Sequence, residues 1–265
     1  MRMTQHTSSY DTGAGYLARV LLDTAAIIVQ SGVGGPIADY IGMPKIHPRG
    51  SFSSVKTGRG QLWEADHHRA MILCSEADAN VVHYLSEGVR FEMNTTHGLE
   101  RGRPDLIRLL ADGTVEVIET KKDKSEVEGN AELADRLRLI ENVCDLEGWD
   151  YRLMFKDEIM RGYTVANANQ ITLDRTTSVT SAERIRLIQA IADGGGWICY
   201  GEAIAALSTN GNFEDGAARA KLHALIVRRV ASVDISKPID LYSAVHLADP
   251  CDDTIDALLE RRLHR

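Results

Sequence analysis

The chain has 265 residues, enough for one large domain or two ordinary ones, and 44% hydrophobic with 26% charged residues is typical of a soluble globular protein. Its formal net charge of −8 argues against indiscriminate binding to nucleic acid, although carboxylates that bind metal ions would give the same balance. The four cysteines form no CxxC pair, which argues against a zinc ribbon or a disulfide framework and predicts reduced thiols in the cytoplasm.

The first part of the chain is expected to form an N-terminal helical extension over residues 1–44. A helical pattern covers about 14–31, and its most apolar stretch, 20–30, contains Asp23 and is too short to span a bilayer. This stretch also lacks the charged start and the cleavage site of a signal peptide. The GVGG sequence at 32–35 has no following Lys-Ser/Thr pair, so it predicts a turn and not a phosphate-binding loop.

Residues 49–60 form a basic, serine-rich run that predicts a loop or extended chain. The next segment, 62–75, has apolar residues at helical spacing and is expected to form a helix that carries Glu64. The adjacent His67 and His68 would point to different faces of this helix. That arrangement favours a solvated or supporting role for them over metal binding.

The stretch RPDLIRLLADGTVEVIETKKD, residues 103–123, predicts a β-hairpin that follows a short strand at 89–93. A three-residue loop with Gly113 in the left-handed region matches the apolar faces of the two strands. In this register Asp105 stands opposite Glu119, with Cβ atoms ~5 Å apart. A two-residue Asp-Gly turn would shift the register by one residue, so the three-residue loop is preferred.

Two carboxylates this close repel each other unless a cation lies between them. Mg²⁺ takes oxygen ligands, typically one or two carboxylates together with substrate phosphate. Lys121 lies two residues beyond Glu119, where it could orient or deprotonate a water and offset negative charge on a phosphate. The alternative is an ordinary hairpin with a solvated charged end. The matched register and the apolar patch beside the carboxylates favour the metal site.

After the hairpin, apolar residues at three- and four-residue steps predict a helix over about 130–147 that Gly148 ends. Residues 151–155 alternate as a strand. The order of helix, strand, hairpin, helix and strand predicts an α/β domain over residues 45–174, with a mixed sheet flanked by helices.

A polar linker at 173–183 marks the expected start of a C-terminal domain over 175–265. Thr180 and Glu183 predict a capping box for the helix that follows. Further elements are expected in this order: a helix near 201–208, a helix over 216–230 and two strands of a wing joined at 236–238. Three helices and a wing predict an α+β winged-helix module.

The sequence PD at 104–105 followed by ETK at 119–121, after a helix with a glutamate, resembles the PD-(D/E)xK nuclease superfamily, whose fold is that of restriction endonucleases. The order of elements is similar to one branch, the TnsA-like endonuclease subunit of heteromeric transposases. That branch has a basic S-x-K segment like SSVKTGRGQLWEADHH, the PD hairpin, a helix, a strand like EGWDYRLMF and an asparagine-containing segment like YTVANANQI. A winged-helix-like module closes with a pattern similar to VDISKPIDL, so the resemblance spans about residues 45–247. It departs at WEADHH, where the family usually reads ES-x-x-E.

The resemblance implies an endonuclease that cuts one DNA strand at each transposon end, beside a DDE-type recombinase subunit and an AAA+ ATPase regulator. It implies Mg²⁺, with Mn²⁺ as a substitute, held by Asp105, Glu119 and Glu64, and it makes Lys121 the catalytic lysine. The candidate contacts to double-stranded DNA are basic residues, for which a solvated face is the alternative: Lys56, Arg59, Lys122, Lys124, Arg219, Lys221, Arg228 and Arg229.

Two other functions stay open at this point. One is a PD-(D/E)xK nuclease that serves restriction or repair. The other is a DNA- or protein-binding adaptor with an inactive nuclease fold, which the joint presence of Asp105, Glu119 and Lys121 disfavours. A neighbouring gene for a DDE-type transposase would distinguish the first reading from the restriction or repair nuclease.

Overall fold

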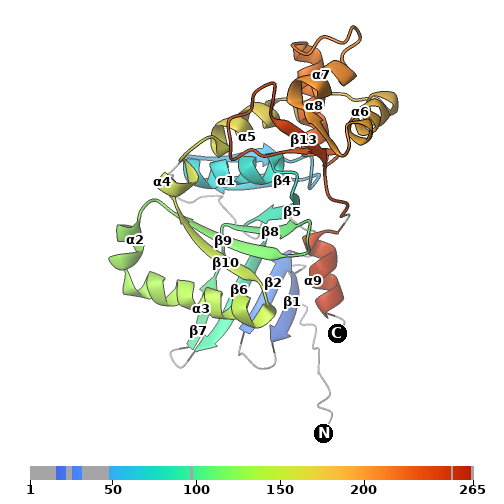
Figure 1. Ribbon diagram of the computed structural model, residues 1–265. Coiled ribbons are helices and arrows are strands. Elements are labelled where there is room, and N and C mark those ends of the chain that lie inside the picture. Colours follow the sequence, from blue (N-terminus) through green and yellow to red (C-terminus); the bar gives the residue numbers. More distant parts are fainter. Residues whose placement is uncertain (1–15, 22–25, 32–47, 96–97, 252, 264–265) are drawn as a thin grey trace.

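The computed structural model describes residues 16–21, 26–31, 48–95, 98–251 and 253–263, and they form a mixed α/β fold with several sheets (Figure 1). The predicted α/β class is therefore confirmed. Within these residues, no helix has both the length and the hydropathy that crossing a membrane requires.

The N-terminal part forms strands where the sequence pattern predicted a helix over 14–31. Antiparallel pairing joins β1 (Tyr16–Leu21), β2 (Ala26–Ser31), β6 (Val89–Thr95) and β7 (Gly98–Gly102) in the order β1-β2-β6-β7. The helix prediction is wrong because short apolar runs fit both periodicities, and β-branched residues such as Ile28 and Val29 favour a pleated sheet. The predicted turn at 32–35 lies outside the described residues.

The central sheet is mixed, as the sequence predicted. Its strands are β5 (Val81–Ser86), β8 (Leu106–Leu110), β9 (Val115–Lys121) and β10 (Asp150–Phe155), in the order β10-β9-β8-β5. β10 runs parallel to β9, whereas β8 is antiparallel to both β9 and β5. A parallel pair needs a crossover connection, and α3 (Ala131–Glu147) supplies it.

Helices cover both faces of this sheet. The face of Leu106 and Ile118 packs in one buried cluster with α1 (Asp66–Ala77) and α5 (Thr164–Leu173). The opposite face, including Ile107 and Val117, is buried in a second cluster with α3 and with apolar residues of β2 and β6. Alternate hairpin residues therefore enter different cores, as the period of two requires.

The ends of α3 follow the local sequence. The Asn130 side chain accepts a hydrogen bond from the Leu133 N–H at the start. At the end Gly148 adopts a left-handed conformation with φ of 68°, as predicted. Four shorter elements complete this part of the chain: β3 (Arg49–Ser53), β4 (Gly60–Glu64), α2 (Lys124–Glu128) and α4 (Lys156–Ile159).

The C-terminal part contains three helices and a three-stranded sheet. The helices are α6 (Ser181–Asp193), α7 (Tyr200–Leu207) and α8 (Gly216–Val227). The strands are β11 (Trp197–Cys199), β12 (Ala231–Val233) and β13 (Ala244–Leu247), in the order β11-β13-β12. The last helix, α9 (Ile255–Leu263), was not predicted, and its Ile255 and Leu259 are buried in the same cluster as α3.

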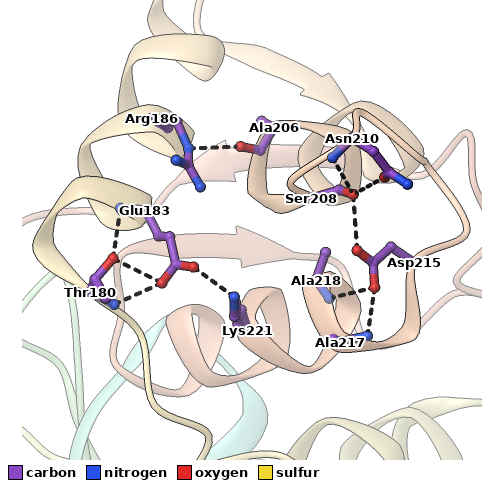
Figure 2. A network of polar contacts seen from close by, with 10 residues as sticks. All are labelled: Thr180, Glu183, Arg186, Ala206, Ser208, Asn210, Asp215, Ala217, Ala218 and Lys221. Atoms are coloured by element: carbon purple, nitrogen blue, oxygen red, sulfur yellow. Dashed lines mark hydrogen bonds and ion pairs between the residues drawn. The ribbon is translucent and has the colours of Figure 1, made fainter.

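The predicted capping box begins α6 (Figure 2). The Thr180 hydroxyl accepts a hydrogen bond from the Glu183 N–H at 3.2 Å, and the Glu183 carboxylate accepts one from the Thr180 N–H at 2.8 Å. The same carboxylate pairs with Lys221 of α8 at 2.6 Å. The cap therefore also ties two helices together.

Replacing Thr180 with alanine is expected to lower the free energy of unfolding by about 1 kcal/mol, because the Glu183 N–H loses its acceptor. Thermal or chemical unfolding measures the change. Thr180→Ser keeps the hydroxyl and is expected to retain most of the stability. Equal stability of the wild type and Thr180→Ala would show that this cap does not matter.

Candidate functional site

The hairpin of β8 and β9 has the predicted register. Leu106 pairs with Ile118 and Leu109 with Val115. Continued by one residue, this register would set Asp105 opposite Glu119, although the paired residues end at Leu106 and Ile118.

The loop that joins the strands fixes this register. The Leu110 N–H donates to the Thr114 carbonyl at 2.9 Å, and the Gly113 N–H donates to the Leu110 carbonyl at 3.0 Å. Gly113 has a φ of 88°, a conformation that residues with a Cβ rarely adopt. The predicted three-residue loop, Ala111 to Gly113, is therefore confirmed.

Asp105 lies at the bend before β8, where four hydrogen bonds hold it. Its Oδ2 accepts from the backbone N–H of Thr120 at 2.7 Å and from the Thr120 hydroxyl at 2.6 Å. Its carbonyl oxygen is 2.9 Å from the Glu87 nitrogen and 3.1 Å from Nε2 of His68. Both the carboxylate and the backbone of Asp105 are thus positioned by the fold itself.

Glu119 and Lys121 form a buried ion pair at the end of β9. Lys121 Nζ contacts Oε1 of Glu119 and also donates to the Thr120 carbonyl at 3.1 Å. The two side chains are only 8% and 12% exposed. The second oxygen of Glu119, Oε2, is buried and has no hydrogen-bond partner among the described residues. An unsatisfied buried carboxylate oxygen is costly, and a bound cation would satisfy it.

The pKa values show that the three side chains act as one electrostatic group. Burial and the negative charge of Asp105 raise the pKa of Glu119 to about 8, against the opposing effect of Lys121. Burial alone would lower the pKa of Lys121, but Glu119 and Asp105 outweigh it and raise that pKa. Burial would likewise raise the pKa of Asp105, but Lys121 and the hydrogen bonds from Thr120 are among the groups that lower it overall. Asp105 is therefore ionised at neutral pH, and the raised pKa of Glu119 reflects its burial beside that charge.

A cavity of about 590 Å³ opens beside this group. Asp105, Thr120 and Lys121 line it, whereas Glu119 does not. Basic side chains at the cavity also include those of Arg103, Lys122 and Lys156. The same lining also holds the carboxylates of Glu64, Asp66, Glu87 and Glu126, so the cavity carries charge of both signs.

Glu64 is not on a helix, contrary to the sequence prediction. It is the last residue of β4, and α1 begins two residues later at Asp66. Within the predicted helix over 62–75, only the part from Asp66 onward is helical. Leu62 to Glu64 belong to a strand that pairs with β3. Glu64 lines the cavity, but its Oε1 forms an ion pair with Arg49 at 2.8 Å.

The structure brings two residues to the site that the sequence did not identify as close to Asp105. His68, Glu87 and Asp105 each offer a ligand-type atom within 4.8 Å of the others. Glu87 lies in the turn after β5 with a φ of 50°, and its carboxylate is 3.3 Å from Nε of Arg103. The only signal in the sequence for Glu87 was its position directly before a turn glycine. His67, which was expected to be solvated or supporting, is half-buried and lines the cavity.

Several basic residues predicted to contact DNA are engaged inside the protein. The Lys56 ammonium contacts three carbonyl oxygens near the end of α1, those of Ser75, Asp78 and Val81. Burial lowers the pKa of Lys56 to about 7 despite the nearby Glu76 and Asp78. Lys56 therefore caps a helix in this structure and has no free donor for a phosphate.

Four other basic residues also have partners. Arg59 pairs with Asp256 at 2.8 Å, and Lys221 pairs with Glu183 (Figure 2). The helix of Lys221 carries no acidic partner for it, but the acidic partner comes from α6. Arg229 donates to the carbonyls of Ala79, Asp249 and Cys251. Arg228 donates to the Thr177 carbonyl at 2.8 Å.

The remaining basic candidates differ in exposure. Lys122 and Lys124 are exposed beside the cavity end of β9, and Arg219 is half-buried on α8. Lys122 lines the cavity itself. Of the predicted contacts, Lys122 and Lys124 are therefore the ones that this structure leaves open to a substrate next to Asp105.

The donor set at the end of the hairpin fits a hard divalent cation. Such ions take carboxylate oxygens, and Asp105 and Glu119 supply them. The Oε2 of Glu119 has no hydrogen-bond partner among the described residues, and burial beside Asp105 raises the pKa of this carboxyl group, so it could take part in holding a cation.

The comparisons with known proteins add no family to this geometry. No protein-family model matches the chain, and no curated protein matches it.

Proposed function

We propose that the chain is a metal-dependent DNA endonuclease of the PD-(D/E)xK type. The observation that carries the proposal is the buried carboxylate of Glu119, whose Oε2 lacks a partner and whose pKa is raised to about 8 beside an ionised Asp105. A divalent cation would relieve both conditions. Lys121, on the same strand end, supplies the third element of the motif.

The arrangement of the fold supports this reading. A mixed sheet with one parallel pair and a helix packed on each face agrees with a restriction-endonuclease-like core (Figure 1). Three helices followed by β12 and β13 agree with a winged-helix module in the C-terminal part. Together they follow the element order expected of the TnsA-like branch.

The mechanism follows from where the residues stand. When bound, Mg²⁺ would polarise the phosphate and make a bound water more acidic. Asp105 and Glu119 would hold the ion, and the two hydrogen bonds from Thr120 keep the Asp105 carboxylate in place. Lys121 would then donate from Nζ to a phosphate oxygen or orient the attacking water, since it lines the cavity. Lys122 and Lys124 would contact the DNA backbone.

The expected substrate is double-stranded DNA at transposon ends, cut together with a DDE-type recombinase subunit under the control of an AAA+ ATPase in the cytoplasm. This part of the proposal derives from the resemblance of the motif order. Cleavage of DNA without transposon ends would instead favour a restriction or repair nuclease. Metal-independent binding without cleavage would favour an inactive adaptor.

The experiment that tests the function separates metal binding from catalysis at Lys121. Lys121→Met is expected to lower Mg²⁺-dependent nicking by about 10²- to 10⁴-fold, because a charged group at the phosphate is lost. Mn²⁺ affinity, measured by calorimetry, should be retained, since the cation replaces the ammonium as the partner of Glu119.

The matched control is Lys237→Met in the C-terminal part, where the lysine side chain is 76% exposed, pairs with Asp234 and does not line the cavity, so nicking should be unchanged. Unchanged nicking by Lys121→Met would remove Lys121 from the mechanism. A wild-type protein that binds no Mn²⁺ would overturn the proposed function even if a missing partner subunit prevents cleavage.

A further inference from the structure

We infer that His68 is a positioning residue of the proposed metal site, whose two ring nitrogens join the backbone of Asp105 to the backbone of Glu64. The inference rests on the proposed function, because it concerns how Asp105 is held for the metal. His68 itself is not a ligand in this arrangement.

Both ring nitrogens of His68 are engaged with neighbouring strands. The residue is the third of α1 and is 2% exposed. Nδ1 is 3.3 Å from the backbone nitrogen of Glu64 at the end of β4. Nε2 is 3.0 Å from Oγ of Ser86 at the end of β5 and 3.1 Å from the carbonyl oxygen of Asp105.

These partners determine the tautomer. The Glu64 N–H can only donate, so Nδ1 must carry a lone pair and no hydrogen. The Asp105 carbonyl can only accept, so Nε2 must carry the hydrogen. The Ser86 hydroxyl agrees, because it donates its own hydrogen to the Leu62 carbonyl and is left to accept from Nε2.

This tautomer excludes the obvious reading of the group formed by His68, Glu87 and Asp105. A metal-bound imidazole must present a lone pair to the ion, but the only lone pair of His68 faces the Glu64 backbone. Nε2, the nitrogen that faces the carboxylates, is N–H. The proximity of the three residues therefore reflects support of Asp105 and not a histidine ligand.

The support acts on the part of Asp105 that the hairpin leaves free. Thr120 holds the carboxylate, but Asp105 precedes β8 and its carbonyl has no partner in the hairpin ladder. His68 and the Glu87 N–H fill that place from α1 and from the turn after β5. Hydrogen-bond partners of this kind typically change metal affinity by about 10- to 100-fold when removed.

Two substitutions test the two ring nitrogens of His68 one at a time. His68→Gln can place an amide N–H near the Nε2 position and so keep the donor to Asp105 and Ser86. His68→Asn can place an amide oxygen near the Nδ1 position and so keep only the acceptor for Glu64. Calorimetric titration of the full chain with Mn²⁺ is expected to show affinity within about threefold of wild type for His68→Gln and at least about tenfold weaker for His68→Asn.

The outcomes distinguish this inference from the proposed function. Mn²⁺ binding by the wild type with equal affinity in His68→Asn would overturn the positioning role and leave the metal site intact. Equal weakening by both variants would overturn it too, since packing alone would then account for the effect. Absence of binding by the wild type would overturn the proposed function.

A second measurement needs no variant and so does not depend on folding of a mutant. Nitrogen NMR of the wild-type histidines is expected to show the Nε2–H tautomer for His68 both before and after addition of Mg²⁺. A ring protonated at Nδ1, or an Nε2 that loses its hydrogen when Mg²⁺ is added, would contradict the inference directly.

Discussion

Asp105→Asn is expected to abolish measurable Mn²⁺ binding and to lower Mg²⁺-dependent DNA cleavage by at least about 10³-fold, equivalent to about 4 kcal/mol of transition-state stabilisation. The amide oxygen of the introduced asparagine can still accept both hydrogen bonds from Thr120, so the bend before β8 should keep its shape. What disappears is the negative charge. Asp105 is the carboxylate that stays ionised at neutral pH and lines the cavity, so it is the first point of attachment for a cation.

The control for this substitution lies at the other end of the same hairpin. Asp112 is exposed in the loop, and its Oδ1 accepts the Thr114 N–H at 2.9 Å, which asparagine can also do. Asp112→Asn is therefore the same chemical change without a metal site and should leave binding and cleavage unaltered. Asp105→Asn protein that still binds Mn²⁺ with wild-type affinity would refute the site assignment.

Glu119→Gln is expected to remove both the metal affinity and a pH dependence of stability. In the metal-free protein the pKa of Glu119 rises from an ordinary 4.5 to about 8 on folding. Between these values the folded state retains a proton that the unfolded state has released. The contribution to stability is thus fully present below pH 4.5 and is lost as the pH rises through 8, with a slope of about 1.4 kcal/mol per pH unit. Glutamine does not titrate, so this slope should be absent.

The comparison is best made from pH 6.5 to 8 by chemical unfolding. Buried histidines make stability rise with pH, but they do so at lower pH. Burial lowers the pKa of His83 to about 4, for example. The difference between wild type and Glu119→Gln cancels that contribution. Added Mn²⁺ should flatten the wild-type curve, because a cation keeps Glu119 ionised, and should not affect the variant. Parallel curves for the two proteins without metal would contradict the raised pKa of Glu119.

The hairpin shows why part of the candidate site could be predicted. Its register depends on a short loop and on alternate apolar residues within residues 103–123, so the information is local. The register of the hairpin, with Leu109 opposite Val115 and Leu106 opposite Ile118, therefore agrees between sequence and structure. The same holds for Gly148 at the end of α3 and for Thr180 with Glu183 at the start of α6.

The predictions that failed concern segments whose local sequence pattern favours a helix but which pair as strands with other segments of the chain. Residues 14–31 have apolar spacing compatible with a helix, but β2 pairs with β6, more than fifty residues away in the chain, and this pairing decides the conformation. Glu64 was placed on a helix because the pattern of α1 was extended too far back, into a strand that pairs with β3.

The sequence by itself determined the hairpin, its register and the identity of the three charged residues at its end, because these depend on contacts between neighbours along the chain. Only the tertiary structure decided which basic residues are free, since Arg59 and Lys56 find their partners in α9 and at the end of α1. It also brought His68 and Glu87 to Asp105 from separate elements. Those contacts depend on how helices and strands pack together, and no spacing within a short stretch of sequence records that.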